Sequence, residues 1–539
     1  MPDGRRRELH ERVVRQLERR EDGLDRHLPE LARHSSAAGP VVDPARTARY
    51  ARLAGAQAMR GLAFEAAIPH FERVLELADR AGLDPATRCD VLLEMAEAER
   101  ALGTPGFTRR CLEAADQARA IGDLHRLSSA AIGAAPAWTL VGLGGLVVEP
   151  EVLELMEEAL AGCRRGSPRW VTLRVTLLVA QSLRLPPGTW DREATAILAC
   201  TDPGDDPSAR ISALLPGIYG GGVIHDRPAV EERVAELREL ATVHDKRQAL
   251  LAADAAEGWL GLLLGDRDRA EAGLARYGRL VDELHLSSVA WTVDLFGGAV
   301  ALLDGRYGDA EALRGRAIAG LTGTNREFGT ALTALQLCVA YRDQGRLPEI
   351  ELFARQLIEQ YREVGPAEER LAWLLVECGH PDEARSVMER AATDGEPSVT
   401  WMRVYEWLVA ATVTHAIEDR GRAEALLDEA APVADLFAVL PGSVPVLGSA
   451  RHGMALLAST LERWSEADEL FETARERYEL LRSPPLLAGA TLHHAEMLVH
   501  RGRAEDRTRA NHLAADAVRT GERLGMAAIV ERGRRVTAG

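Results

Sequence analysis

The second half of this chain repeats a helix-turn-helix pattern at nearly constant spacing. Its turns are 34 to 42 residues apart, and each lies between an apolar segment and an alanine-rich amphipathic one. The turn residues are expected at Gly265, Gly305, Gly345, Gly379, Arg420, Glu462 and Gly502. A period of this length without strand signals is typical of stacked helical hairpins, which bury their apolar faces only against their neighbours. We therefore expect an all-α, right-handed superhelix.

Small residues recur at two positions of each repeat. Seven residues before the expected turns stand Gly258, Gly298, Cys338, Ala372, Val413, Ala455 and Ala495. Five residues after the turns stand Ala270, Ala310, Ile350, Ala384, Ala425, Ala467 and Arg507. Small side chains at both positions let paired helices approach to about 8–10 Å, which is the packing of tetratricopeptide (TPR) repeats. Ile350 and Arg507 depart from this pattern, so the register of their hairpins is less firmly specified.

The composition supports an elongated helical protein. A chain of 539 residues exceeds what one compact core usually supports, which favours a solenoid with a distributed core. Aromatic residues make up 5% and charged residues 27%, as in helix-rich proteins rather than β-sandwiches. The formal net charge is -17, whereas a nucleic-acid-binding surface needs a basic patch to displace counterions from phosphates. We therefore expect no direct contact with nucleic acid.

Signals for export and for membrane insertion are missing from the sequence. The opening MPDGRRRELHERVV lacks the apolar core of a signal peptide, and no apolar run approaches the ~18 residues that cross a bilayer. The six cysteines are scattered and form no CxxC pair. Lys246 is the only lysine, so a phosphate-binding GxxxxGK[ST] loop is excluded. We expect a cytoplasmic protein without membrane contact, bound metal or cofactor.

Breaks in the helical pattern divide the chain into four regions. Proline and glycine residues interrupt the first region, and the stretches LRLPPGTWDRE and LLPGIYGGGVIHDRP interrupt the third. Asp84 followed by Pro85 is a good N-cap and first-turn pair for a helix of the second region. The expected regions are an N-terminal helix and broken linker (1–42), N-terminal TPR-like hairpins (43–135), irregular helical repeats with long loops (136–245) and regular TPR-like repeats (246–539).

Several phrases in the chain are found in the same order in one kind of regulator. They are LHERVVRQLE, LPELARH and AGAQAMRGLAFEAAIPHFERVLEL near the start, and LDEAAPVADLF, GSARHGMALLASTLERW and AADAVRTGERLGM near the end. The chain thereby resembles the C-terminal repeat region of large bacterial ATP-binding regulators of the LuxR type and the AAA adenylate-cyclase-like type. In that family the region is taken to sense inducers or partner proteins. The family's ATPase and helix-turn-helix modules are not readable in this sequence, so the resemblance does not imply ATP or DNA binding.

The first helix of each TPR-like hairpin is expected to line the concave groove. Aromatic and arginine side chains in such a groove are typical anchors for a partner. The inward positions map to Trp259, Thr292, Arg342, Trp373, Trp407, His452, Glu496 and His500. Each tryptophan taken alone fits intramolecular packing as well, but together these residues predict a groove of mixed apolar and polar character.

Two patterns suggest chemistry. His493, Glu496 and His500 stand at helical steps of three and four, which places them on one helix face, yet their order differs from the HExxH of zinc hydrolases. His225 and Asp226 follow three glycines and offer an acid-base pair, although a flexible loop explains them equally. No metal site is predicted from the first pattern, and the second is kept as an alternative.

The sequence predicts a non-catalytic regulatory scaffold that binds a protein or peptide partner, or a small-molecule inducer, in its groove. One alternative is an enzyme in which the region 136–245 folds over the groove and supplies His225 and Asp226 to a substrate. A second alternative is a regulator fragment without independent function. The sequence leaves self-association into a homo-oligomer open.

Overall fold

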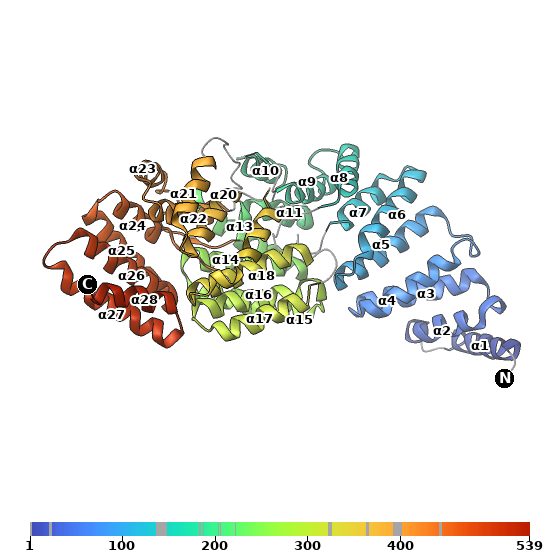
Figure 1. Cartoon of the computed structure of the whole chain (residues 1–539). Coiled ribbons are helices and arrows are strands. Elements are labelled where there is room, and N and C mark those ends of the chain that lie inside the picture. The colour runs from blue at the N-terminus through green and yellow to red at the C-terminus, as the bar shows by residue number, and fades with distance from the viewer. Residues whose placement is uncertain are drawn as a thin grey trace.

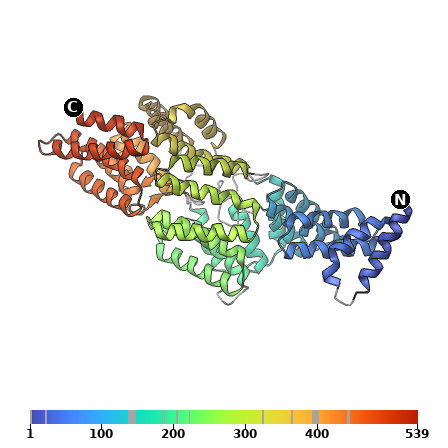
Figure 2. The same cartoon turned by 90° about the horizontal axis from the view of Figure 1, so that it is seen from below.

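The computed structural model is an all-α, TPR-like superhelix of antiparallel helical hairpins, as the repeats predict. The molecule is elongated, and its two termini lie at opposite ends (Figure 1; Figure 2). The structure describes residues 3–20, 24–135, 148–182, 185, 186, 188–202, 204, 206–220, 222–321, 326–362, 366–391, 402–440 and 445–538.

The N-terminal arm consists of hairpins, and aspartate side chains cap the first turns of α3, α5 and α7. The Asp84 carboxylate accepts a hydrogen bond from the Thr87 backbone N–H at 2.9 Å, so the predicted N-cap is confirmed. The arm contains α1 (Asp3–Glu18), η1 (Leu24–His27), α2 (Leu28–Ala38), η2 (Gly39–Val41), α3 (Pro44–Arg60), α4 (Phe64–Leu77), α5 (Pro85–Leu102), α6 (Gly106–Ile121) and α7 (Leu124–Gly133).

The middle of the chain has shorter helices of unequal length. Two of them, α9 and α11, begin with a proline directly after a capping residue, and α13 has a proline at its second position, which sets the first turn. They are α8 (Pro150–Gly162), α9 (Pro168–Ala180), α10 (Thr189–Leu198), α11 (Pro207–Tyr219), α12 (Gly222–His225) and α13 (Arg227–Val243).

The second half contains the regular repeats. Five of the seven expected turn residues are glycines in the left-handed region, which end the first helix of each hairpin, and Glu462 adopts the same conformation. The elements are α14 (Arg247–Leu264), α15 (Arg267–Glu283), α16 (Ser287–Leu303), α17 (Tyr307–Ala319), α18 (Arg326–Asp343), η6 (Leu347–Ile350), α19 (Glu351–Gln360), α20 (Ala367–Glu377), α21 (Pro381–Ala391), α22 (Arg403–Ala416), α23 (Arg420–Asp428), β1 (Phe437–Ala438), β2 (Gly448–Ser449), α24 (Ala450–Thr460), α25 (Trp464–Leu480), α26 (Pro484–Arg501), α27 (Asp506–Leu524) and α28 (Ala527–Ala538).

Glycines and alanines bring the two helices of a hairpin together. A Cβ atom on Gly261 would lie 2.4 Å from the backbone nitrogen of Ala270, and one on Gly258 would lie 2.5 Å from Leu274 Cδ2. Real Cβ atoms do not approach other atoms so closely, so α14 and α15 pack at a distance that excludes side chains at these positions. The small-residue positions seen in the sequence therefore have the packing role expected of them.

One of the expected turns is displaced by two residues. The left-handed residue between α22 and α23 is Glu418 (φ 57°) and not Arg420, because the Asp419 carboxylate caps the helix that begins at Arg420. Counted from Glu418, the two close-packing positions are Ala411 and Ala423, and both are fully buried. The corrected register thus fits the small-residue pattern better than the expected one.

The two exceptions to that pattern also have structural explanations. Ile350 ends the short 3-10 turn η6, which delays the second helix, and Ala354 is the small buried residue of that hairpin. Arg507 is only partly buried, and Ala510 takes the close-packing position because α27 begins later than in the other repeats.

The superhelix closes on itself in the second half. The Ser483 hydroxyl donates to the Leu303 carbonyl oxygen at 2.9 Å, across 180 residues of sequence, and α26 packs on α16. Further along, α28 packs on α18. A segment between α23 and β2, which we call the inner strap (residues 430–440), packs against α14 and α22, the first helices of their hairpins, which are expected to line the concave side. Its β1 residues pair with β2 in a short antiparallel hairpin that the sequence did not predict.

Candidate ligand cavity

The closure of the superhelix leaves a cavity of about 130 Å³ among α18, α20, α22, α24, α26 and α28. These are the inner helices of successive repeats together with the last helix of the chain. The apolar wall includes Trp373, Leu408, Leu447, Leu456, Leu486 and Ile529. The polar side chains in the wall include Arg342, Asp343, Glu377, His452, His493 and Arg532.

Two guanidinium groups of the cavity are already paired with carboxylates. Arg342 Nη2 lies 2.7 Å from Asp343 Oδ1, and Arg532 Nη2 lies 2.6 Å from Glu496 Oε2. Burial opposes the charge of each arginine, but these carboxylates outweigh it, so the pKa of both is raised. Both arginines are therefore ionised and neutralised inside the protein.

Glu377 is different, because its carboxyl group has no ion-pair or hydrogen-bond partner among the described residues. It is the last residue of α20, where the helix dipole disfavours a negative charge. Burial raises the pKa of Glu377, and the nearby Arg342 and Arg532 offset part of that rise. The cavity thus contains one acidic group whose interactions are not satisfied by the protein.

A chain of hydrogen bonds ends at the cavity. The Ser449 backbone N–H donates to the Tyr478 hydroxyl oxygen at 2.8 Å, and that hydroxyl lies 3.1 Å from His452 Nδ1. His452 Nε2 lies 2.9 Å from His493 Nδ1. Tyr478 is fully buried, and among the described residues His452 Nδ1 is the acceptor within reach of its hydroxyl, so the hydroxyl donates to Nδ1. The proton of neutral His452 is then on Nε2, which donates to His493, and neutral His493 carries its own proton on Nε2.

The histidines at the cavity are neutral. Burial lowers the pKa of His452 to about 3, and the neighbouring His415 and Arg342 lower it further. Burial also places the pKa of His493 well below its usual value, and it lowers the pKa of His415, a neighbour of His452 outside the cavity wall, to about 4. They contribute hydrogen-bonding groups but no positive charge at neutral pH.

Three of the predicted groove residues, Arg342, Trp373 and His452, line this cavity. Glu496 takes part through its ion pair with Arg532. Trp407 lies outside it, in the wall of a wider groove between α20 and α23, and its indole N–H donates to the Leu426 carbonyl oxygen at 3.1 Å.

The other three predicted groove residues, Trp259, Thr292 and His500, lie away from this cavity. Trp259 is 2% exposed and Thr292 is 0% exposed, because the closed superhelix covers the inner faces of α14 and α16 with the inner strap and α26. The Thr292 hydroxyl donates to the Val289 carbonyl oxygen and lies 2.8 Å from the Tyr277 hydroxyl. His500 is exposed near the end of α26 and bonds the Glu496 carbonyl oxygen. None of the three lines the cavity.

The alternative catalytic pair does not lie at this cavity. His225 ends the short helix α12 and is exposed. Asp226 is also exposed, and its carboxylate caps α13 by accepting a hydrogen bond from the Ala229 N–H at 3.2 Å. Capping is a sufficient role for Asp226.

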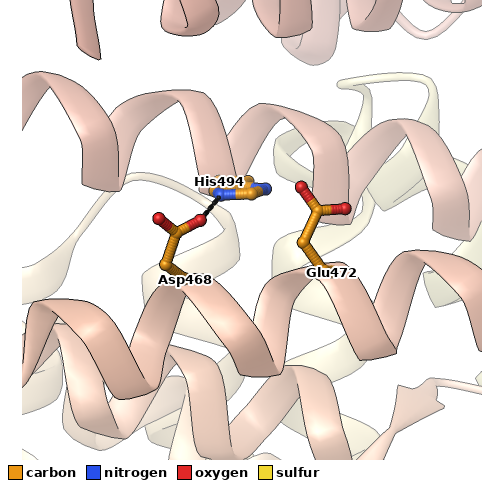
Figure 3. Close-up of side chains that lie close together, drawn as sticks. All are labelled: Asp468, Glu472 and His494. Atoms are coloured by element: carbon orange, nitrogen blue, oxygen red, sulfur yellow. Dashed lines mark hydrogen bonds and ion pairs between the residues drawn. The ribbon is translucent and has the colours of Figure 1, made fainter. Parts of the chain in front are cut away.

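On the helix face with His493, Glu496 and His500, each of the three residues has a different partner. Within the described ranges, the trio close enough to hold a metal is Asp468, Glu472 and His494. Figure 3 shows the buried His494 ring between the two carboxylates, with a hydrogen bond to Asp468. Arg509 pairs with both carboxylates, so a cation already occupies this cluster and we assign no metal to it.

Glu377 and Arg532 were not predicted from the sequence. Arg532 reaches the cavity only because the last helix folds back on α18, which no local pattern indicates. The sequence does contain a signal for Glu377, because it lies four residues after the predicted groove residue Trp373 and therefore on the same face of α20.

The fold and the cavity define a TPR-like helical-repeat protein. No family model matches the chain, and no curated protein matches it by sequence. Among solved structures, the chain is similar to yeast Tom70, at 13% identity over 93% of this chain and 97% of that chain, with a TM-score of 0.34. It is also similar to the APC/C hetero-tetramer Cut9-Hcn1, at 13% identity over 92% of this chain and 98% of that chain, with a TM-score of 0.39. Every helix that the structure describes is too short or too polar to cross a bilayer.

Proposed function

We propose that this protein is a non-catalytic regulatory scaffold that holds a small-molecule inducer in the cavity and binds a protein partner on its repeat surface. The observation that carries the proposal is the closure of the superhelix around a cavity of about 130 Å³. A dry engineered cavity of about 150 Å³ binds benzene, so this one admits a small molecule or a single side chain but not a helix.

The position of the cavity supports a sensing role. Its wall joins α18 to α28, the two ends of the closed turn. A ligand that contacts both helices favours the closed arrangement, because it binds that arrangement more tightly than an open one. A partner that recognises the surface of the closed turn then responds to the ligand.

The regulatory part of the proposal is also supported by the resemblance to the repeat region of bacterial ATP-binding regulators. A cytoplasmic location and an origin in such a regulator belong to the same proposal. We assign no catalytic residue, since the arginines of the cavity are paired with carboxylates and its histidines are held by hydrogen bonds.

Gly489 offers a direct test. It lies in the cavity wall on α26, and a Cβ atom added there would meet no atom within 4 Å. Gly489→Leu therefore fills the cavity without a clash at the first carbon. Gly315→Leu is the matched control, because Gly315 is an exposed glycine on α17 with equally free space.

The experiment compares melting temperatures with and without the small-molecule fraction of a cell extract. We expect the fraction to raise the melting temperature of the wild-type protein and of Gly315→Leu, and to leave that of Gly489→Leu unchanged. An equal rise in Gly489→Leu, or no rise in any of the three proteins, contradicts the proposal.

A further inference from the structure

We infer that the cavity recognises a primary ammonium group on a small apolar body, with Glu377 and Trp373 as its binding residues. This inference rests on the proposed function, because it names the chemistry of the ligand that the cavity takes.

The charges around the cavity call for a cation. The cavity wall and its ion-pair partners contain the guanidinium groups of Arg342 and Arg532, and the carboxylates of Asp343, Glu377 and Glu496. Each guanidinium forms its ion pair with another carboxylate and acts on Glu377 only through space, so the three carboxylates exceed the two guanidinium groups by one negative charge. An unpaired carboxylate in a recessed site is costly, and a cationic ligand removes that cost.

The arrangement on α20 suits an ammonium group in particular. Trp373 and Glu377 are one helical turn apart, and both belong to the cavity wall. An aromatic face beside a carboxylate offers an ammonium ion a cation–π contact and a charge-assisted hydrogen bond together. The surrounding leucines and Ile529 then contact the apolar part of the ligand.

An anionic ligand fits the cavity less well. Both guanidinium groups are occupied by carboxylates of the protein, and the nearby histidines are uncharged. Glu377 would repel a second negative charge. His493 has a ring N–H left to donate, which serves a neutral acceptor elsewhere on the ligand.

The test uses the full chain and n-butylammonium as the probe. Sodium butyrate and 1-butanol have the same carbon skeleton with a negative charge or no charge. Binding is measured by calorimetry and by the shift in melting temperature. We expect butylammonium to bind at least about tenfold more tightly than either analogue, because only it forms a charge-assisted contact with Glu377.

Two variants locate the contact. Glu377→Gln removes the charge with little change of shape and is expected to weaken butylammonium binding about tenfold or more. Gly489→Leu is expected to abolish it by filling the cavity. Glu531→Gln is the matched control, because Glu531 is an exposed carboxylate next to Arg532 on α28, and it should bind as the wild type does.

A second probe, Nα-acetyl-lysine amide, distinguishes two sources of the primary ammonium group. Binding of this compound at the wild-type site identifies a lysine side chain of a partner protein as a fitting source, whereas binding of butylammonium alone identifies a free amine. Either result supports the ammonium assignment, provided that Glu377→Gln removes the binding.

The inference is overturned if butyrate or butanol binds as tightly as butylammonium, or if Glu377→Gln binds the amine unchanged. If neither amine binds while the extract fraction raises the melting temperature of the wild type but not of Gly489→Leu, the ammonium assignment is wrong and the proposed function is still supported. If neither the amines nor the extract fraction binds, both the ammonium assignment and the proposed function are wrong.

Discussion

The indole N–H of Trp259 donates a hydrogen bond to the backbone carbonyl of Val439, 180 residues further along the chain. Val439 belongs to the inner strap, so a segment of the protein itself covers the concave face of α14. Repeat solenoids use this concave face as an extended binding surface. In this protein the inner strap covers the concave face at α14, and α28 packs on α18 further along the chain. The cavity is the recessed site that remains.

The inner strap is expected to be a firm part of the fold. Phe437 is fully buried and packs over Gly265, where an added Cβ would lie 2.5 Å from its ring. Phe437→Ala should lower the free energy of unfolding by about 3–5 kcal/mol, the usual cost of deleting a buried phenylalanine ring. Urea denaturation measures this loss. Leu480→Ala is the control, since Leu480 is 74% exposed and its loss should cost under about 0.5 kcal/mol. Equal stability of the two variants would show that the inner strap is not packed firmly against α14.

Helix pairing within the hairpins depends on glycine at the closest contact. Gly261→Ala places a Cβ 2.4 Å from a backbone atom of Ala270 and should destabilise the protein by about 1–3 kcal/mol. Gly315→Ala adds the same atom on an open helix surface and should stabilise it by up to about 1 kcal/mol. The two melting temperatures should therefore move in opposite directions, and a rise for both would mean that α14 and α15 are further apart.

The register of the hairpin formed by α22 and α23 can be tested in the same way. Ala423 is buried and Ala425 is exposed. Ala423→Leu should cost about 1–3 kcal/mol by overpacking, and Ala425→Leu should change stability little. The reverse order, measured by chemical denaturation, would support the register expected from a turn at Arg420.

These two hairpin contacts show how far the sequence determines the fold. Periodicity and small residues predict the hairpins, because the packing involved is local. The sequence places the turn between α22 and α23 at Arg420, next to a glycine, whereas the structure has it at Glu418. The Asp419 cap decides where the second helix begins.

The cavity was predictable only in part, because it depends on contacts between distant repeats. Arg342, Trp373 and His452 follow from their inward positions in the repeat. The burial of Trp259 and the arrival of Arg532 depend on a superhelix that closes after about 180 residues, as the Ser483–Leu303 bond shows. No local pattern in the sequence reports that pitch.

Stability should fall in mild acid. Burial lowers the pKa of His452 to about 3, so its contribution to stability is complete above the ordinary histidine pKa of 6.5 and is lost as the pH falls from there toward 3. His452→Gln keeps one acceptor and one donor but does not titrate. Between pH 7 and pH 5 its melting temperature should fall less than that of the wild type, because it has one buried histidine fewer to protonate. Parallel curves for the two proteins would contradict this.

Glu377 should have the opposite pH dependence. Burial raises its pKa above the ordinary value of 4.5, so its ionised form destabilises the native state increasingly as the pH rises above that value. Glu377→Gln should therefore melt at a higher temperature than the wild type at pH 8 and at nearly the same temperature at pH 4. A variant that is less stable at pH 8 would mean that the carboxylate has a partner in the native state.

Native mass spectrometry of protein purified directly from cells tests the central claim most directly, because it records the mass of any small molecule retained in the cavity. We expect one small adduct on the wild-type protein and on Gly315→Leu, and none on Gly489→Leu. The same adduct on all three proteins, or on none of them, would contradict the assignment of the closed cavity as the ligand site.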